Sequence, residues 1–188
     1  VYQLFSYIPQ NTQEHKTKDQ KTLSLELSKI SNLNPAFLNL KYEPLRDSLE
    51  KLKDPIKERL SPTQLESFNK AYSHLAENLF PFLPYLNKTV SHGDIHPDNI
   101  LWEENNIKAF IDWELAAIRE ELYDLSFLLG CIAIDDPLEL SKDLVKELIT
   151  AFTEHAKPTK LAFILLPELV LATRIKWLYK WLMCKNDT

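Results

Sequence analysis

The chain has 188 residues, 45% of them hydrophobic, and a formal net charge of −5 at pH 7. This length and apolar content are enough for one domain with a core of its own. The negative charge and the lack of a run rich in lysine and arginine argue against a surface that neutralises nucleic-acid phosphates or anionic lipid head groups. We therefore expect a small-molecule partner, no nucleic acid and no membrane.

Helical periodicity dominates the chain. An apolar, strand-like opening at 1–8 precedes the first periodic stretch. Leucine and isoleucine then recur every three or four residues in segments that we predict to be helices: 15–33, 45–60, 64–82, 121–134, 138–156 and 159–183. The Ser61-Pro62-Thr63 sequence ends one of these helices and caps the next.

Strand-like segments interrupt the helices in the middle of the chain. Residues 89–91 are extended in character, and two short strands at 100–102 and 107–111 flank a polar turn. The predicted fold class is α+β and mostly α, a helical bundle with a small antiparallel β-hairpin.

The cysteine pattern and the longest apolar run bear on the compartment. Cys131 and Cys184 lie far apart, without a C-x-x-C pair, which favours a reducing cytoplasm. The apolar run at 161–172 is interrupted by Pro167 and Glu168 and is too short for a membrane span of roughly 20 residues. We expect a cytoplasmic protein.

The densest cluster of chemically capable side chains is the segment from Ser91 to Asn99, which we predict to be a loop. An acid followed after four residues by an asparagine, as in Asp94 and Asn99, is the spacing of kinase catalytic loops. The predicted hairpin would return Asp112 to the side of Asn99. An amide and a carboxylate suit Mg²⁺, which prefers oxygen ligands, so we predict that Asn99 and Asp112 hold the metal while Asp94 aligns the substrate hydroxyl.

The motif HGDIHPDN at 92–99, followed by IDWE at 111–114, resembles the aminoglycoside phosphotransferase and choline kinase-like family. This resemblance implies the carboxyl-terminal lobe of a protein-kinase-like fold and ATP-dependent phosphate transfer to a hydroxyl of a small molecule, with Mg²⁺ and ATP as cofactors. It assigns Asp94 as the base and Asn99 and Asp112 as magnesium ligands, and it places Ile111 beside the nucleotide. The acceptor is left open between an aminoglycoside, choline, homoserine and a sugar-like alcohol.

Two further segments carry the resemblance. Tyr123-Asp124-Leu125-Ser126 matches an element in which Asp124 braces the catalytic loop. Residues 1–10 resemble the last strand and hinge of an amino-terminal lobe, with Phe5, Tyr7 and Ile8 at the adenine. With only two glycines in the chain, no glycine-rich phosphate loop can be formed. We therefore expect 1–188 to be a single carboxyl-terminal lobe whose nucleotide-binding amino-terminal lobe is absent, with little or no activity alone.

Other interpretations of the same residues remain open. His92, Asp94 and His96 alternate, and on a strand they would form a metal site for a hydrolase; we interpret the two histidines instead as groups that support the loop. Glu114 either assists the metal or is simply solvated. A non-catalytic kinase-like binding domain is a third possibility.

The aromatic residues of the last helix also allow two interpretations. Trp177, Tyr179 and Trp181 either line a substrate pocket or pack in the core, and core packing is favoured because it is the common role of aromatic residues on a helix. The segment 116–120 after Asp112 lacks the glycine that related sequences often carry there, and its backbone path is not predicted.

Overall fold

Helices account for most of the structure, a computed structural model that describes residues 20–133 and 137–184. The predicted opening strand and the hinge residues Phe5, Tyr7 and Ile8 lie outside the described residues. The helices are α2 (Gln20–Ser31), α3 (Leu45–Lys57), α4 (Pro62–Asn78), α5 (Tyr123–Ile132), α6 (Asp143–Ala156), α7 (Lys160–Ile164) and α8 (Leu166–Cys184).

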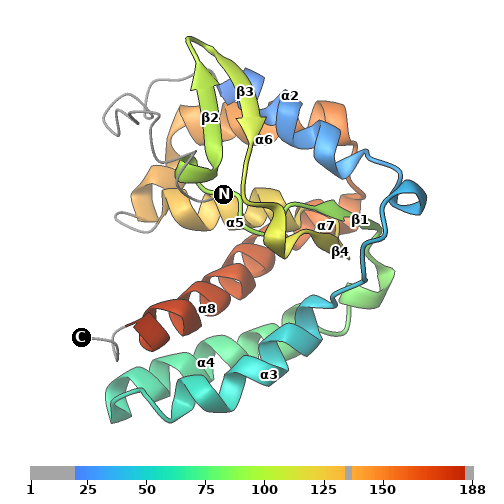
Figure 1. The fold of residues 1–188 in the computed structure, drawn as a ribbon. Helices are drawn as coiled ribbons and strands as arrows, with labels where there is room; N and C mark the ends of the chain where they lie inside the picture. The colour runs from blue at the N-terminus through green and yellow to red at the C-terminus, as the bar shows by residue number, and fades with distance from the viewer. Residues whose placement is uncertain (1–19, 134–136, 185–188) are drawn as a thin grey trace.

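Two small antiparallel sheets lie among the helices (Figure 1). The strands are β1 (Lys88–Ser91), β2 (Ile100–Glu103), β3 (Asn106–Phe110) and β4 (Ala117–Glu120). β2 and β3 form the predicted hairpin, with Ile100 opposite Phe110 and a register shift between Leu101 and Trp102. The predicted fold class, mostly helical with a small antiparallel hairpin, is confirmed.

The second sheet pairs β1 with β4, with Ser91 opposite Ala117 and Lys88 opposite Glu120. The sequence did not predict β4, because its partner lies on the other side of the hairpin and the alternation in a four-residue strand is too short to detect. This pairing fixes the two ends of the segment that contains the catalytic-loop motif.

The helix boundaries differ from prediction in the second half of the chain. The stretch expected as one helix over 138–156 is a 3-10 helix, Pro137–Ser141, followed by α6. The stretch over 159–183 is divided into α7 and α8 near Leu165. Pro167 lies in the first turn of α8, where the missing amide hydrogen costs nothing, so the proline starts a new helix instead of continuing α7.

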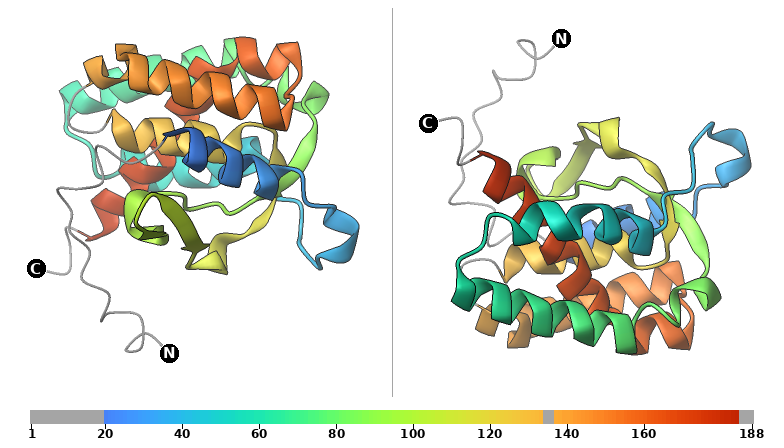
Figure 2. Two further views of the ribbon diagram at one scale, coloured as in Figure 1. Left: turned by 90° about the horizontal axis from the view of Figure 1, so that it is seen from above. Right: turned by 90° about the horizontal axis from the view of Figure 1, so that it is seen from below.

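α8 is the central helix of the fold. It packs against α5 on one side and against α3 and α4 on the other, and the view from below in Figure 2 shows α3 and α4 crossing in front of it. The side chains of Leu169 and Ala172 on α8 are fully buried. α8 therefore connects the α3–α4 pair to the part of the molecule that carries the loop.

Ser61 begins α4 as predicted. Its hydroxyl accepts a hydrogen bond from the Gln64 backbone while the Gln64 side chain accepts one from the Ser61 backbone. This reciprocal cap satisfies two donors at the helix start.

Two consecutive buried glutamates hold distant segments together just before α5. Glu120 accepts hydrogen bonds from the Leu45 backbone and from the Tyr42 hydroxyl. Glu121 accepts hydrogen bonds from the backbone of Asn87 and from the backbone and hydroxyl of Thr159. Carboxylates at helix starts satisfy unpaired amide hydrogens, so this pair fixes the starts of α3 and α7 relative to β4.

No helix in the described ranges, 20–133 and 137–184, is both long enough and apolar enough to cross a membrane.

Candidate active site

Asp124 in the first turn of α5 holds the start of the loop. Its Oδ1 accepts hydrogen bonds from the Ser91 hydroxyl at 2.7 Å and from the Gly93 backbone at 2.9 Å. Its Oδ2 accepts one from the His92 backbone at 2.8 Å. The carboxylate is 4% exposed, and such charge-assisted bonds are among the stronger ones in proteins. The contacts fit the bracing role expected for Asp124.

Gly93 occupies a position that only glycine fits. Its φ is +89°, and a Cβ at this position would collide with the Leu115 carbonyl and lie 2.6 Å from Nη1 of Arg119. A side chain would therefore meet both backbone strain and steric overlap. The glycine lets the loop turn sharply between His92 and Asp94.

His92 is fully buried and links the loop to the hairpin. Its Nε2 lies 2.9 Å from the Ile111 carbonyl, and its Nδ1 lies 3.4 Å from the Asp94 backbone nitrogen. The neighbours assign the hydrogen to Nε2, because a carbonyl only accepts and a backbone amide only donates. Burial lowers the pKa of His92, opposed chiefly by the charge of Asp124, so the ring is neutral and structural.

Asp94 and Asn99 face each other across the loop. The Asn99 amide nitrogen donates to the Asp94 carbonyl at 2.9 Å, and the side chain of Asp94 remains 13% exposed. Because the Asn99 nitrogen is committed to the loop, its Oδ1 is the atom that could meet a cation. The Asp94 carboxylate is thus partly exposed, whereas Asn99 is 6% exposed.

Asp112 follows β3 at the open end of the hairpin. The Ile111 backbone donates to the Asn99 carbonyl at 3.0 Å, so Asp112 follows directly after the residue that is bonded to Asn99. Asp112 is exposed and has a left-handed backbone with φ of 64°. Non-glycine residues in this region cost energy and concentrate at functional sites. Glu114, two residues further on, is exposed in a 3-10 turn.

His96 lies at the edge of the loop, partly exposed. Its Nδ1 is 3.7 Å from an oxygen of Asp98, and its ring meets Trp177 of α8 edge-on with 6.1 Å between centroids. In the described part of the chain no group of three or more histidine, cysteine, aspartate or glutamate side chains is arranged to hold a metal. Both nitrogens of His92 have protein partners, so His92 does not support the hydrolase interpretation.

Sequence reasoning missed a basic residue at the site. Lys180 on α8 places its Nζ 3.2 Å from Oδ1 and 3.3 Å from Oδ2 of Asp94. The two residues are 86 positions apart, and Lys180 belongs to a helix whose pattern indicates only packing. A signal existed in the spacing of Lys176 and Lys180, since lysines four residues apart share one helix face.

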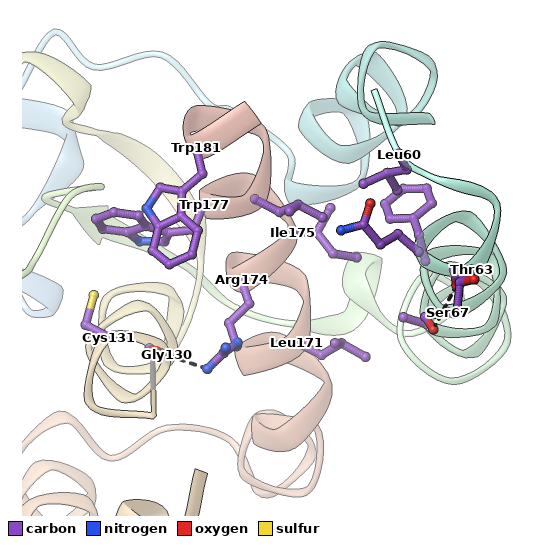
Figure 3. Close-up of a pocket in the computed structure, with 14 residues that line it drawn as sticks. Leu60, Thr63, Ser67, Gly130, Cys131, Leu171, Arg174, Ile175, Trp177 and Trp181 are labelled. Atoms are coloured by element: carbon purple, nitrogen blue, oxygen red, sulfur yellow. Dashed lines mark hydrogen bonds between the residues drawn. The ribbon is translucent and has the colours of Figure 1, made fainter. Parts of the chain in front are cut away.

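A cavity of about 450 Å³ lies beside the loop, between α4, α5 and α8 (Figure 3). Trp177 and Trp181 line it on α8, and Cys131 and Ser67 line it on the facing helices. Trp177 also packs against the core, as does Tyr179, which is absent from the cavity lining. A role of Trp177 and Trp181 in binding substrate stays a prediction. Burial raises the pKa of Cys131 to about 12, so its thiol is un-ionised at neutral pH.

A loop braced by a helix start, with its asparagine bonded to the residue after a hairpin strand, is the arrangement that the resemblance to kinase-like phosphotransferases leads one to expect. Residues 2–161 match the phosphotransferase enzyme family (APH). The chain belongs to this family, and the predicted resemblance is confirmed.

Individual relatives agree with the family. A homoserine kinase from Zymomonas mobilis subsp. mobilis is 28% identical over 112 residues, 54% of this chain and 35% of the kinase. A choline/ethanolamine kinase family protein from Mesorhizobium loti superposes with a TM-score of 0.60 at 16% identity, over 90% of this chain and 55% of that one. A macrolide 2'-phosphotransferase from Brachybacterium faecium gives 0.59 at 15% identity, over 89% and 54%.

The two structural matches show the fold alone. The chain spans about a third of the length of the homoserine kinase and about half of the two solved proteins.

Proposed function

We propose that the chain carries the catalytic loop of an ATP-dependent kinase that transfers the γ-phosphate to a hydroxyl of a small molecule. The observation that carries the proposal is the joint placement of Asp94, Asn99 and Asp112. Asn99 is bonded through its side chain to the Asp94 carbonyl and through its carbonyl to the residue before Asp112. One asparagine is therefore bonded to the backbone of Asp94 and to that of the residue before Asp112.

Asp94 is the proposed base. Its side chain is mostly buried but open on one side, so a substrate hydroxyl can donate a hydrogen bond to it and pass it the proton during transfer. The loop that carries Asp94 is held by Asp124 and His92, which fix the carboxylate before substrate binds. Positioning of this kind is the main contribution that a protein makes to phosphate transfer.

Asn99 and Asp112 are the proposed ligands of Mg²⁺. Both carry an oxygen, the donor that Mg²⁺ prefers, and the amide nitrogen of Asn99 already donates to the Asp94 carbonyl, which leaves its Oδ1 as the atom for the metal. The exposed, strained position of Asp112 leaves its carboxylate accessible to a metal bound to the phosphates of ATP. The ion would neutralise charge on the transferred phosphate, and Ile111 would lie beside the nucleotide.

The rest of the nucleotide site is proposed to come from an amino-terminal lobe. Residues 1–10 would be its last strand and hinge, with Phe5, Tyr7 and Ile8 at the adenine. The half-length match to the solved proteins and the lack of a glycine-rich loop support this division. The two-glycine chain would then depend on a second lobe for the phosphate cradle.

Calorimetric titration with ATP, with and without Mg²⁺, tests the metal site. We expect binding that depends on Mg²⁺ and that Asp112→Asn weakens at least about tenfold, because a charged ligand is lost. Asp143→Asn, which changes an exposed aspartate on α6, is the matched control and should bind like the unchanged chain. If the chain binds no nucleotide, the titration is repeated on the chain joined to its amino-terminal lobe.

Turnover separates the base from the metal ligands. In the protein with both lobes, Asp94→Ala should abolish phosphate transfer and leave Mg-nucleotide affinity unchanged, whereas Asp112→Ala should weaken that affinity. Equal and mild effects of both changes on transfer would contradict the assignment.

A further inference from the structure

The ion pair between Lys180 and Asp94 joins α8 to the loop that carries the proposed base. Lys180 is 46% exposed and Asp94 is 13% exposed, so the pair borders solvent. Lys180 also lies over the ring of Trp177, 5.6 Å from its centroid, and Trp177 lines the neighbouring cavity. Lys180 thus contacts both the proposed base and a tryptophan of the cavity wall.

A second lysine lies one turn earlier on the same face of α8. Lys176 donates a hydrogen bond to the Tyr123 hydroxyl at 2.7 Å and lies over that ring at 5.1 Å. A neutral phenol does not compensate a buried ammonium. The pKa of Lys176 is lowered to about 8, chiefly by burial and then by the charges of Arg119 and Lys180, against the opposing charges of Glu43 and Asp94.

Arg119, Lys176 and Lys180 differ in their carboxylate partners. Arg119 pairs with Glu43 at 2.6 Å, and Lys180 pairs with Asp94. Lys176 pairs with no carboxylate in the described part of the chain. Lys176 is therefore an ammonium without a carboxylate partner among the described residues, on the same helix as the lysine that pairs with the proposed base.

We propose that Lys176 and Lys180 form the anion site for the acceptor, and that the acceptor is a small alcohol carrying a carboxylate. The inference rests on the proposed function, because it places the acceptor hydroxyl at Asp94. In the transfer, the acceptor oxygen forms a bond to the γ-phosphorus of ATP, the bond from that phosphorus to the bridging oxygen of ADP breaks, and the hydroxyl proton passes to Asp94.

Acceptor binding would also change the partner of Lys180. Without acceptor, its ammonium contacts both oxygens of Asp94. A substrate carboxylate competes for the same ammonium and frees Asp94 to accept the hydroxyl proton. A cationic acceptor would instead be repelled by Lys176 and Lys180 and would leave Asp94 occupied.

The anion at Lys180 could also be the phosphate of ATP. Binding in the absence of nucleotide distinguishes an acceptor carboxylate from an ATP phosphate, because a hydroxy acid binds without nucleotide only if the site belongs to the acceptor. Titration by nuclear magnetic resonance with three probes of one length distinguishes charge: 4-hydroxybutanoate, 4-hydroxybutanamide and 4-amino-1-butanol.

We expect 4-hydroxybutanoate to bind more tightly than the amide and the amine without nucleotide. Lys180→Met should weaken it at least about tenfold and Lys180→Arg much less, because truncating one partner of a partly buried charge pair has a large effect. Lys176→Met should weaken it as well. Lys146→Met removes an exposed lysine on α6 and serves as the control for net charge.

Several results would overturn the anion site. These are absent binding of 4-hydroxybutanoate, tighter binding of the amide or amine, an equal loss in Lys146→Met, and a Lys180→Met effect confined to Mg-ATP. Thermal unfolding of each variant ensures that a loss of binding is not a loss of fold.

Different results would contradict the proposed kinase function and the proposed anion site. If hydroxy-acid binding depends on Lys180 but the protein with both lobes transfers no phosphate to any alcohol, the anion site stands and the kinase assignment does not. If phosphate transfer occurs with amine acceptors in preference to acids, the kinase assignment stands and the anion site does not.

Discussion

The Oδ1 atom of Asp124 lies 2.9 Å from the backbone nitrogen of Gly93, so the first turn of α5 and the residue before the proposed base are held as one unit. The same carboxylate also accepts from the residues on either side of the β1 end. The residue before Asp94 is therefore tied to the first turn of α5.

Asp124→Asn should destabilise the protein by about 1–3 kcal/mol, because the amide nitrogen replaces one acceptor and faces a buried donor. Thermal unfolding measures the loss. Asp143→Asn, on an exposed ion pair with Lys146, should leave the unfolding midpoint unchanged. A midpoint for Asp124→Asn equal to that of the unchanged chain would show that the loop is held by other contacts.

Gly93→Ala should destabilise the protein more than the addition of a single methyl group would suggest. The positive φ alone costs an alanine about 1–2 kcal/mol, and the collision with the Leu115 carbonyl adds to it. Gly130→Ala is the matched control: Gly130 lies within α5, and its added Cβ would be 3.3 Å from Cγ of Arg174. Helix propensity offsets that contact, so we expect a change within about 1 kcal/mol. Comparable losses from both substitutions would contradict the special role of Gly93.

Local signals account for what the sequence predicted. Ser61 and Gln64 form the cap that their spacing indicates, and the β2–β3 hairpin follows from a polar turn between two short apolar runs. The pairing of β1 with β4 and the contact of Lys180 with Asp94 depend on residues far apart in the chain, which no periodic pattern encodes. The division of α7 from α8 was readable in principle from Pro167.

The candidate site likewise combines residues that local patterns predicted with residues that they did not. The motif spacing indicated that Asp94, Asn99 and Asp112 would converge, because a hairpin is a local structure. The charge at the approach to Asp94 comes from α8 and could not be inferred, since the helix face that turns toward the loop is decided by packing against α3, α4 and α5. Acceptor chemistry is therefore the part of the function least visible in the sequence.

His92 gives the protein an acid-sensitive element. Its pKa is lowered in the folded state by burial, so protonation favours the unfolded chain. Stability is then fully present above the ordinary histidine pKa of about 6.5 and is lost as the pH falls from there through the folded-state pKa. Thermal unfolding between pH 7.5 and pH 5 should show a steeper decline for the unchanged chain than for His92→Gln. Parallel curves would mean that His92 does not titrate in this way.

Lys176 predicts a pH dependence at the alkaline end. Its pKa falls from an ordinary 10.5 to about 8 in the folded state, so the unfolded chain binds this proton more tightly. The destabilising contribution is complete below about pH 8 and disappears as the pH rises toward 10.5, and the sign of the linkage makes stability rise across this window.

Lys176→Met isolates this contribution. The substitution also removes the bond to the Tyr123 hydroxyl, but that loss adds an offset that varies little with pH until the phenol ionises, and burial raises the pKa of Tyr123 above its ordinary range. The free energy of unfolding of the unchanged chain should therefore rise relative to Lys176→Met by about 1–2 kcal/mol between pH 7 and pH 9.5. Denaturant unfolding at both pH values measures it. A difference in unfolding free energy that is the same at both pH values would show that the Lys176 ammonium is already compensated. The acceptor anion site, which depends on that ammonium lacking a carboxylate partner, would then lose its support.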